Sequence, residues 1–218
     1  MCGRFVVAPS SVTDVQKFYN VKESHAFDAS YNVAPTSKVP VVLESEDGID
    51  REIRMMRWGL IPSWAKDKSI GNKLFNARSE TVMEKPAFRK AYEKRRCVIP
   101  ASGFYEWQKP SKQPYYFTAP DGIFPFAGLW ERWNSPEGEL VDSFTILTTE
   151  ANDTVRPVHG RMPVILSHNL VGAWLTSAPD KELLETIAQP FGGSMTVCMV
   201  GNRVNSPRNN DPTLINSL

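Results

Sequence analysis

The sequence predicts an α+β protein whose mostly antiparallel sheet forms a half-closed barrel, with short helices at its periphery. Runs of β-favouring residues follow one another closely and are joined by turn signals, which is typical of hairpins and not of crossover helices. The 218 residues are 41% hydrophobic and 22% charged, an ordinary composition for a globular chain of this length. No repeat, linker or low-complexity segment interrupts the sequence, so we expect one domain over residues 1–218.

Nine short runs have the composition of β-strands. We expect strands at residues 3–8, 39–43, 52–58, 97–108, 115–118, 126–133, 140–149, 164–166 and 195–200. The Asp47-Gly48 pair predicts a hairpin turn between the second and third runs. The segments 31–36 and 75–80 are rich in turn-forming residues, and we expect both to be irregular.

Four segments carry apolar residues at helical spacing. The first begins after Ser10 or Ser11, either of which can cap it, and places Val15 and Tyr19 on one face. The others cover residues 84–94, 169–176 and 180–188. All four are short, which is why we expect them around the sheet and not at the centre of the fold.

The charges are distributed unevenly. The net charge is only +1, but residues 54–96 contain 12 Lys or Arg against 4 Asp or Glu. This excess indicates either an anionic partner or a solvated basic helix face.

Three widely spaced cysteines without a CxxC pair indicate neither a disulfide framework nor a metal site. Without a leader or a long apolar run, we expect a cytoplasmic monomer that needs no cofactor and does not contact a membrane.

Cys2 has distinctive chemistry if Met1 is removed, because its thiol and its free α-amine then lie two carbons apart. Such a 1,2-aminothiol can attack an aldehyde with the amine and close a thiazolidine ring with sulfur. The α-amine has an ordinary pKa of ~7.7–8.0, so about a tenth of it is neutral and nucleophilic at pH 7. The alternative is an ordinary cysteine in a first strand.

Other residues are candidates for acid/base chemistry or for binding nucleic acid. Glu106 lies between aromatic residues, where burial would raise its pKa, although a strand glutamate is usually solvated. His159 lies between two prolines, and a structural histidine is the alternative. Asn76 and Arg78 bring an amide and a guanidinium into one loop. Trp64, in a lysine-rich loop, is either a base-stacking platform or a core residue.

Seven sequence blocks occur together in one order. They are Met1-Cys2-Gly3-Arg4-Phe5, Tyr31-Asn32-Val33-Ala34-Pro35, Trp58-Gly59-Leu60-Ile61-Pro62-Ser63-Trp64, Asn76-Ala77-Arg78-Ser79-Glu80-Thr81, Phe104-Tyr105-Glu106-Trp107, His159-Gly160-Arg161-Met162-Pro163 and the tail from Val204 to Asn210. In this arrangement the whole chain resembles the SRAP family, the SOS response-associated peptidases that process abasic sites in DNA.

The resemblance implies a self-modifying enzyme that forms a covalent thiazolidine crosslink between Cys2 and a ring-opened abasic site in single-stranded DNA, and so shields the lesion during replication. It implies that Asn76 orients Cys2 and senses the lesion, and that Glu106 and His159 are the acid/base pair. It also implies removal of Met1, by the protein itself or by an aminopeptidase, a lyase side activity, and association with the nucleoid while the protein is engaged on DNA.

For the DNA itself we expect phosphate contacts from Arg4, Arg78 and Arg161, with Asn32 and Trp64 completing the binding surface. The chain departs from the family pattern in two places. Gly160 replaces a bulkier polar residue, which predicts a looser hold on the neighbouring histidine. Ala65 replaces an aromatic residue, which predicts a weaker wedge against stacked bases.

Two other functions remain open from the sequence. An N-terminal-nucleophile thiol peptidase or amidohydrolase could use Cys2 with a general base and never act on DNA. A non-enzymatic single-strand binder is the third possibility. The basic segment 54–96 argues against the first, and the candidate residues Cys2, Glu106 and His159 argue against the second.

Overall fold

The computed structural model describes the chain except for residues 1, 9–11, 22–26, 46–47, 49, 121 and 177–180. Its strands are β1 (Arg4–Val7), β2 (Ser30–Val33), β3 (Lys38–Glu44), β4 (Arg51–Trp58), β5 (Asn76–Arg78), β6 (Arg96–Ala101), β7 (Gly103–Trp107), β8 (Pro114–Thr118), β9 (Phe124–Asn134), β10 (Leu140–Glu150), β11 (Arg161–Pro163) and β12 (Thr196–Met199). Its helices are α1 (Val12–Tyr19), α2 (Arg89–Lys94), α3 (His168–Thr176) and α4 (Lys181–Ile187). Short 3-10 turns are η1 (Lys68–Lys73), η2 (Ser79–Thr81), η3 (Asn202–Asn205) and η4 (Pro212–Ile215).

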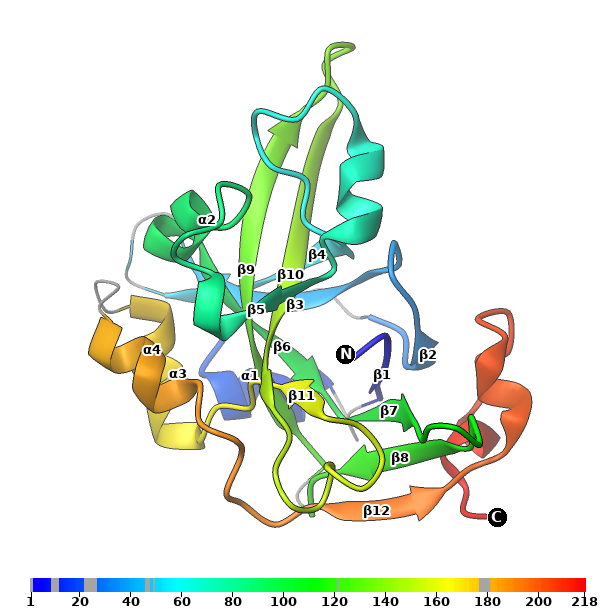
Figure 1. Cartoon of the computed structure of the whole chain (residues 1–218). Coiled ribbons are helices and arrows are strands. Elements are labelled where there is room, and N and C mark those ends of the chain that lie inside the picture. The colour runs from blue at the N-terminus through cyan, green and yellow to red at the C-terminus, as the bar shows by residue number, and fades with distance from the viewer. Residues whose placement is uncertain are drawn as a thin grey trace.

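Five strands close into a barrel (Figure 1). The ring runs β10-β4-β3-β6-β9 and is closed by the long antiparallel pairing of β9 with β10. β11 and β5 extend this sheet from β10, and the pairings of β10 with β4 and with β5 are parallel. The predicted class, an α+β fold with a largely antiparallel barrel and short peripheral helices, is therefore confirmed.

The second sheet has the order β12-β8-β7-β1-β2. Its strand β1 lies between β2 and β7 and pairs antiparallel with both. Phe5 of β1 packs edge-on against Trp58 of the barrel, with ring centroids 4.8 Å apart. Phe104 of β7 stacks on Phe117 and meets Phe126 of β9. One hydrophobic core thus joins the two sheets and fixes the N-terminal strand against the barrel.

The prediction of one strand over residues 97–108 is wrong, because the chain changes sheet in the middle of that run. β6 belongs to the barrel and β7 to the second sheet. Ser102 lies between them, where its N–H donates to Val6 O at 2.8 Å and its hydroxyl accepts from Ala8 N at 2.9 Å. Gly103 permits this change of sheet, since a Cβ there would come within 2.5 Å of Phe117 O.

Other differences arise from tertiary pairing and from proline. The turn-prone segments 31–36 and 75–80 were expected to be irregular, but β2 extends into the first and β5 lies within the second, because β2 pairs with β1 and β5 pairs with β10. The helix expected at 84–94 is shortened to α2, consistent with Pro86 disfavouring helical backbone just before it. The strand expected at 164–166 lies three residues earlier, as β11.

The expected cap at Ser10 or Ser11 and the turn at Asp47 fall outside the described residues, and so does the start of the helix expected at 180–188. The remaining expected strands and helices are confirmed in position, with ends shifted by one or two residues. Within the described ranges, no helix has both the length and the apolar character needed to span a membrane.

Candidate active site

Cys2 is fully buried, two residues before the start of β1, and its carbonyl oxygen accepts a hydrogen bond from an amide side chain of another strand. Asn76 opens β5, which pairs in parallel with β10 and sets Asn76 opposite Ile146. From there its Nδ2 donates to Cys2 O at 2.6 Å. The residue predicted to orient Cys2 is therefore in direct contact with it. Met1 and its predicted removal lie outside the described residues.

The side-chain oxygen of Asn76 can also accept a hydrogen bond. Its Oδ1 is buried and has no hydrogen-bond partner among the described residues. A buried acceptor without a donor typically costs about 1–3 kcal/mol, and such groups in native proteins call for an explanation. An incoming hydroxyl or amine N–H would supply the missing donor, so the amide can hold Cys2 and bind a ligand at the same time.

Glu106 lies in β7, one residue beyond the pairing of Arg4 with Tyr105, and is therefore level with the N-terminal end of β1. It is only 3% exposed. Burial raises the pKa of Glu106, and the nearby charge of His159 opposes that rise. A carboxyl group with a raised pKa can donate and accept a proton nearer to neutrality, as general acid/base chemistry requires.

His159 lies in the turn before β11, with its Nδ1 4.0 Å from Glu106 Oε1. Arg161 holds the ring through its backbone: its N–H donates to Nδ1 at 3.0 Å, and its carbonyl oxygen lies 3.1 Å from the same atom. The N–H of Arg161 can donate to an unprotonated Nδ1, and the carbonyl oxygen of Arg161 can accept from a protonated one. Either protonation state of this nitrogen therefore has a partner, which suits a group that exchanges protons.

The Cys2 thiol is held in its neutral form. Burial raises the pKa of this thiol far above its usual value, and the negative charge of Glu106 adds to the effect. The Sγ atom lies 3.8 Å from Arg4 O, where the thiol can act as a weak donor. Nucleophilic cysteines in thiol enzymes have the opposite property, a lowered pKa that yields a thiolate.

The residues predicted to bind DNA divide into two groups. Trp64 is 58% exposed, in the loop that leads to η1. Arg78 is also exposed, and in β5 it lies on the same face as Asn76, two residues away. Trp58, in contrast, is completely buried and donates its indole N–H to Phe75 O at 2.8 Å. Of the two tryptophans, only Trp64 is available to stack on a base.

Arg4 and Asn32 are engaged inside the protein. Arg4 Nη1 donates to Asn32 Oδ1 at 2.9 Å and to Val204 O at 3.0 Å. Asn32 is 4% exposed, and its amide nitrogen donates to the carbonyl oxygens of Val204, Ser206 and Asn209. Together they tie the C-terminal segment to the N-terminal strands. Their contact with DNA stays a prediction.

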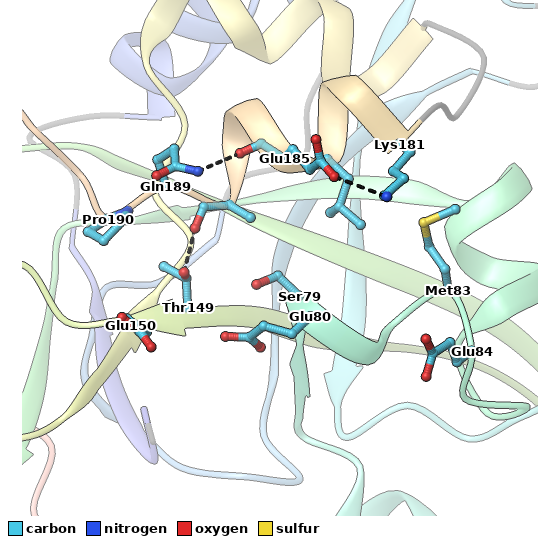
Figure 2. Close-up of a pocket in the computed structure, with 12 residues that line it drawn as sticks. Ser79, Glu80, Met83, Glu84, Thr149, Glu150, Lys181, Glu185, Gln189 and Pro190 are labelled. Atoms are coloured by element: carbon cyan, nitrogen blue, oxygen red, sulfur yellow. Dashed lines mark hydrogen bonds and ion pairs between the residues drawn. The ribbon is translucent and has the colours of Figure 1, made fainter.

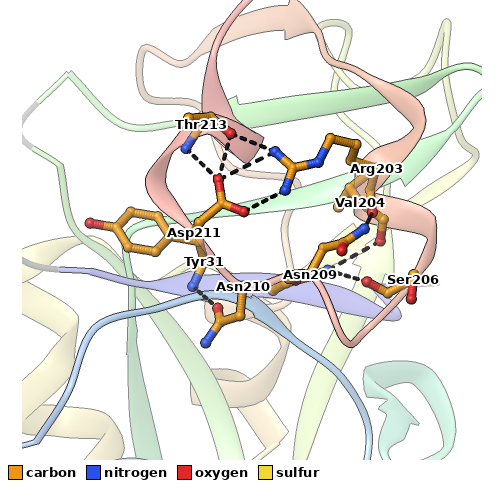
Figure 3. A network of polar contacts seen from close by, with 9 residues as sticks. Tyr31, Arg203, Val204, Ser206, Asn209, Asn210, Asp211 and Thr213 are labelled. Carbon is orange, nitrogen blue, oxygen red and sulfur yellow. Dashed lines mark hydrogen bonds and ion pairs between the residues drawn. The ribbon is translucent and has the colours of Figure 1, made fainter.

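The C-terminal segment has its own polar network (Figure 3). Asn210 Oδ1 accepts from the backbone of Tyr31 at 2.7 Å, next to Asn32 in β2. Arg203 pairs with Asp211 at 2.7 Å and donates to Thr213 at 2.8 Å. The sequence indicates the tail as a block, but nothing in its composition indicates that it holds β2, the strand that pairs with β1.

Arg161 has an acidic partner that the sequence analysis did not single out. Its guanidinium forms an ion pair with both carboxylate oxygens of Glu80 and donates to Thr148 O at 2.7 Å. The ion pair lowers the pKa of Glu80. Glu80 lies in the same block as Asn76, which is the only sequence signal that could have found it. A phosphate contact by Arg161 stays a prediction.

The backbones of Gly160 and Ala65 both accept hydrogen bonds, and the effects expected of these two residues stay predictions. A Cβ at Gly160 would meet nothing within 4 Å, and the Gly160 carbonyl accepts from Ala151 N at 3.1 Å, so the backbone holds this turn. Ala65 O accepts from the indole of Trp133 at 2.7 Å. The described residues contain no group of three or more side chains suited to hold a metal ion.

Comparison with known proteins gives a consistent result. A model of the family described as SOS response associated peptidase (SRAP) matches residues 1–207. Abasic site processing protein YoqW of Bacillus subtilis (strain 168) is 41% identical over 226 aligned positions that cover all of both chains. Abasic site processing protein HMCES of Xenopus tropicalis is 33% identical, covering 97% of this chain and 77% of its own.

Solved structures agree at the level of the fold. A crystal structure of a protein from Bacteroides thetaiotaomicron superposes with a TM-score of 0.89 at 29% identity, over the whole of both chains. One from Bordetella bronchiseptica superposes with a TM-score of 0.79 at 28% identity, over 92% of this chain and all of the other. The resemblance inferred from the seven sequence blocks is confirmed.

Proposed function

Because this chain belongs to the SRAP family, we propose that it processes abasic sites in DNA and does so by forming a covalent bond through Cys2. The observation that carries the proposal is the contact of Asn76 with Cys2 beside the Glu106–His159 pair. This contact supports the proposal because Asn76 can bind a sugar, and Glu106 and His159 can move protons.

The reaction begins with the amine of Cys2, once Met1 has been removed by the protein or by an aminopeptidase. The neutral amine adds to the C1′ aldehyde of the ring-opened sugar, and the resulting carbinolamine loses water to give a Schiff base. The thiol then adds to the same carbon, and its proton passes to the former imine nitrogen. One water leaves in total, and the product is a thiazolidine.

Glu106 and His159 serve the proton transfers in this sequence. Loss of water from the carbinolamine needs a general acid, and the buried Glu106 is suited to this because its pKa is raised. Since the thiol starts out protonated, its addition needs a base, and the ionised Glu106 can take that role in turn. His159 donates a proton to the ring oxygen as the sugar opens.

Asn76 supports recognition of the lesion. Its Nδ2 fixes the backbone of Cys2, and its Oδ1 accepts a hydrogen bond from a hydroxyl of the open sugar. Arg78 and Trp64 meet the flanking phosphates and bases of single-stranded DNA. The covalent product shields the abasic site where replication exposes a single strand. If ring closure fails, the Schiff base permits β-elimination, which is the lyase activity.

A denaturing gel tests this function. The full chain, expressed so that Met1 can be removed, is incubated with a single-stranded oligonucleotide carrying one abasic site. We expect a denaturation-resistant shifted band. The matched control replaces the abasic sugar by its tetrahydrofuran analogue, which has the same shape but no aldehyde, and should give no such band. Equal bands with both oligonucleotides, or no band with either, would contradict the proposal.

The thiol-peptidase alternative is less well supported. It requires Cys2 to act as a thiolate, but burial and the charge of Glu106 both raise the pKa of the thiol. The amine-first reaction needs no thiolate, because the sulfur attacks only an already electrophilic carbon. The non-enzymatic binder leaves the buried Glu106 and the half-buried His159 beside it without a role.

A further inference from the structure

A pocket separate from the candidate active site lies between α4 and the edge formed by η2 and β10 (Figure 2). Its volume is about 430 Å³, within the range of small-molecule sites. None of Cys2, Asn76, Glu106 and His159 lines it. Its wall combines apolar side chains, including Met83 and Leu184, with a rim of charged ones.

The rim is strongly acidic. It carries four carboxylates, those of Glu80, Glu84, Glu150 and Glu185, and one ammonium group, that of Lys181. Two of the four are already neutralised: Glu185 pairs with Lys181 at 3.4 Å, and Glu80 pairs with Arg161. Glu84 and Glu150 make no ion pair within the described part of the chain, so the rim keeps an excess of negative charge.

A buried hydroxyl gives a second and independent indication of a ligand. Ser79 is only 3% exposed, and its Oγ has no hydrogen-bond partner among the described residues. Figure 2 shows this hydroxyl on the wall of the pocket, turned toward the space below α4. The neighbouring hydroxyl of Thr149, in contrast, donates to Ala188 O. Buried hydroxyls in native proteins normally have a partner, and a ligand N–H would complete this one.

We propose that this pocket binds an organic cation, an ammonium or guanidinium group carried on an alkyl stem. The stem would lie on Met83 and Leu184, one N–H would reach Ser79 Oγ, and the unpaired carboxylates Glu84 and Glu150, at opposite ends of the pocket, would attract the positive charge. The same chemistry can come from a free polyamine or from an arginine or lysine side chain of a protein partner. This binding needs neither DNA nor Cys2, so it stands independently of the proposed function.

Isothermal titration calorimetry of the full chain tests the proposal without DNA. The probes are N-acetyl-arginine methylamide, spermidine and the uncharged isostere N-acetyl-citrulline methylamide. We expect saturable binding of at least one cation and none of the isostere. Tighter binding of spermidine identifies a free polyamine as the source, and tighter binding of the arginine derivative identifies a protein side chain.

Variants assign the binding to this pocket. Glu84→Gln with Glu150→Gln should weaken the cation at least about tenfold. Ser79→Ala should weaken it by a smaller factor while the melting temperature stays near that of the wild type. The matched control, Glu137→Gln with Glu182→Gln, removes two exposed glutamates outside the pocket and should leave affinity unchanged. Failure of every cation to bind, equal binding of the isostere, or equal loss in both double variants would overturn the proposal.

Discussion

The candidate active site and the Trp64 loop differ in construction. Cys2 and Glu106 are almost fully buried in strands or beside them, while Trp64 is 58% exposed in a loop. The loop contacts the barrel through Ala65 O, which accepts a hydrogen bond from Trp133. Trp133 pairs with Val141 of β10, and Asn76 pairs with Ile146 of the same strand, five residues further along. At about 3.4 Å per residue, the two regions are separated by about 17 Å along β10.

The difference suits the role that we propose for each region. Proton transfer to and from a sugar requires fixed donors and a raised carboxyl pKa, and burial supplies both. A base that stacks on an aromatic ring requires exposed apolar area before it binds. We therefore expect substitutions in the buried region to change rates, and substitutions in the exposed region to change DNA affinity.

The largest effect is expected from Cys2→Ala. The variant keeps its α-amine after Met1 removal but has no sulfur to close the ring. The stable adduct should disappear from a denaturing gel, while borohydride should trap a Schiff base and abasic DNA should be cut by β-elimination. Cys198→Ala removes the half-buried thiol of β12 and serves as the matched control, with crosslinking at the wild-type level. Loss of the adduct in both variants would mean that the effect is not specific to Cys2.

Glu106→Gln should come next, slowing crosslinking by about 10²-fold or more while DNA affinity stays near the wild-type value. Single-turnover kinetics and a separate binding titration measure the two quantities. If the crosslinking rate and the DNA affinity fall together, Glu106 has a structural role. The expectation that substitutions in the buried region change only rates would then be wrong.

Glu106→Gln should also change the stability of the protein. Burial raises the pKa of Glu106, so the folded chain holds a proton that the unfolded chain releases. This stabilising contribution is complete below the usual glutamate pKa and is lost as pH rises through the raised pKa. Glutamine cannot ionise. The melting temperature of Glu106→Gln should therefore exceed that of the wild type near pH 7, with the difference vanishing near pH 4.

A smaller effect is expected from Trp64→Ala. Loss of a stacking platform should weaken binding of single-stranded DNA by about 1–3 kcal/mol, while the crosslinking rate at saturating DNA stays unchanged. Trp58→Ala is the contrasting control, because Trp58 is completely buried and its loss should lower the melting temperature instead. If the Trp64→Ala protein is unfolded, Trp64 has a structural role like that of Trp58, and the proposed contrast between the two regions is wrong.

Arg78→Ala should have the smallest effect. An exposed arginine that contacts a phosphate contributes to counterion release, so its loss should reduce the salt dependence of DNA binding by about one charge and weaken binding to all sequences alike. Titrations at several salt concentrations measure the slope. Lys112→Ala, at an exposed turn between β7 and β8, is the control and should leave the slope unchanged.

The sequence singled out the residues of the candidate site because they carry recognisable chemistry. An aminothiol at position 2, a glutamate between aromatic residues and a histidine between prolines each indicated a role before any contact was known. The hydrogen bond from Asn76 to Cys2 agrees with the orienting role that the family resemblance implied. The roles themselves stay proposals until the rates of the variants are measured.

The predictions that could not be made from sequence concern pairing between distant segments. The run 97–108 reads as one strand, because periodicity does not show that Ser102 leaves one sheet for another. Arg4 and Asn32 contact each other and Val204, and no sequence pattern indicated these contacts, while their contact with DNA stays a prediction. The contacts with Val204 join residues 200 and 172 positions apart, which no local pattern reports.

Intact mass spectrometry of the wild-type crosslink tests the central claim most directly, since it identifies the bond through which the N-terminus acts. The protein is joined to an abasic single-stranded oligonucleotide and is measured before and after borohydride. The account predicts the mass of the chain without Met1 plus that of the oligonucleotide minus one water, unchanged by the reductant. An adduct that retains Met1, or one that gains two hydrogens on reduction, would contradict it.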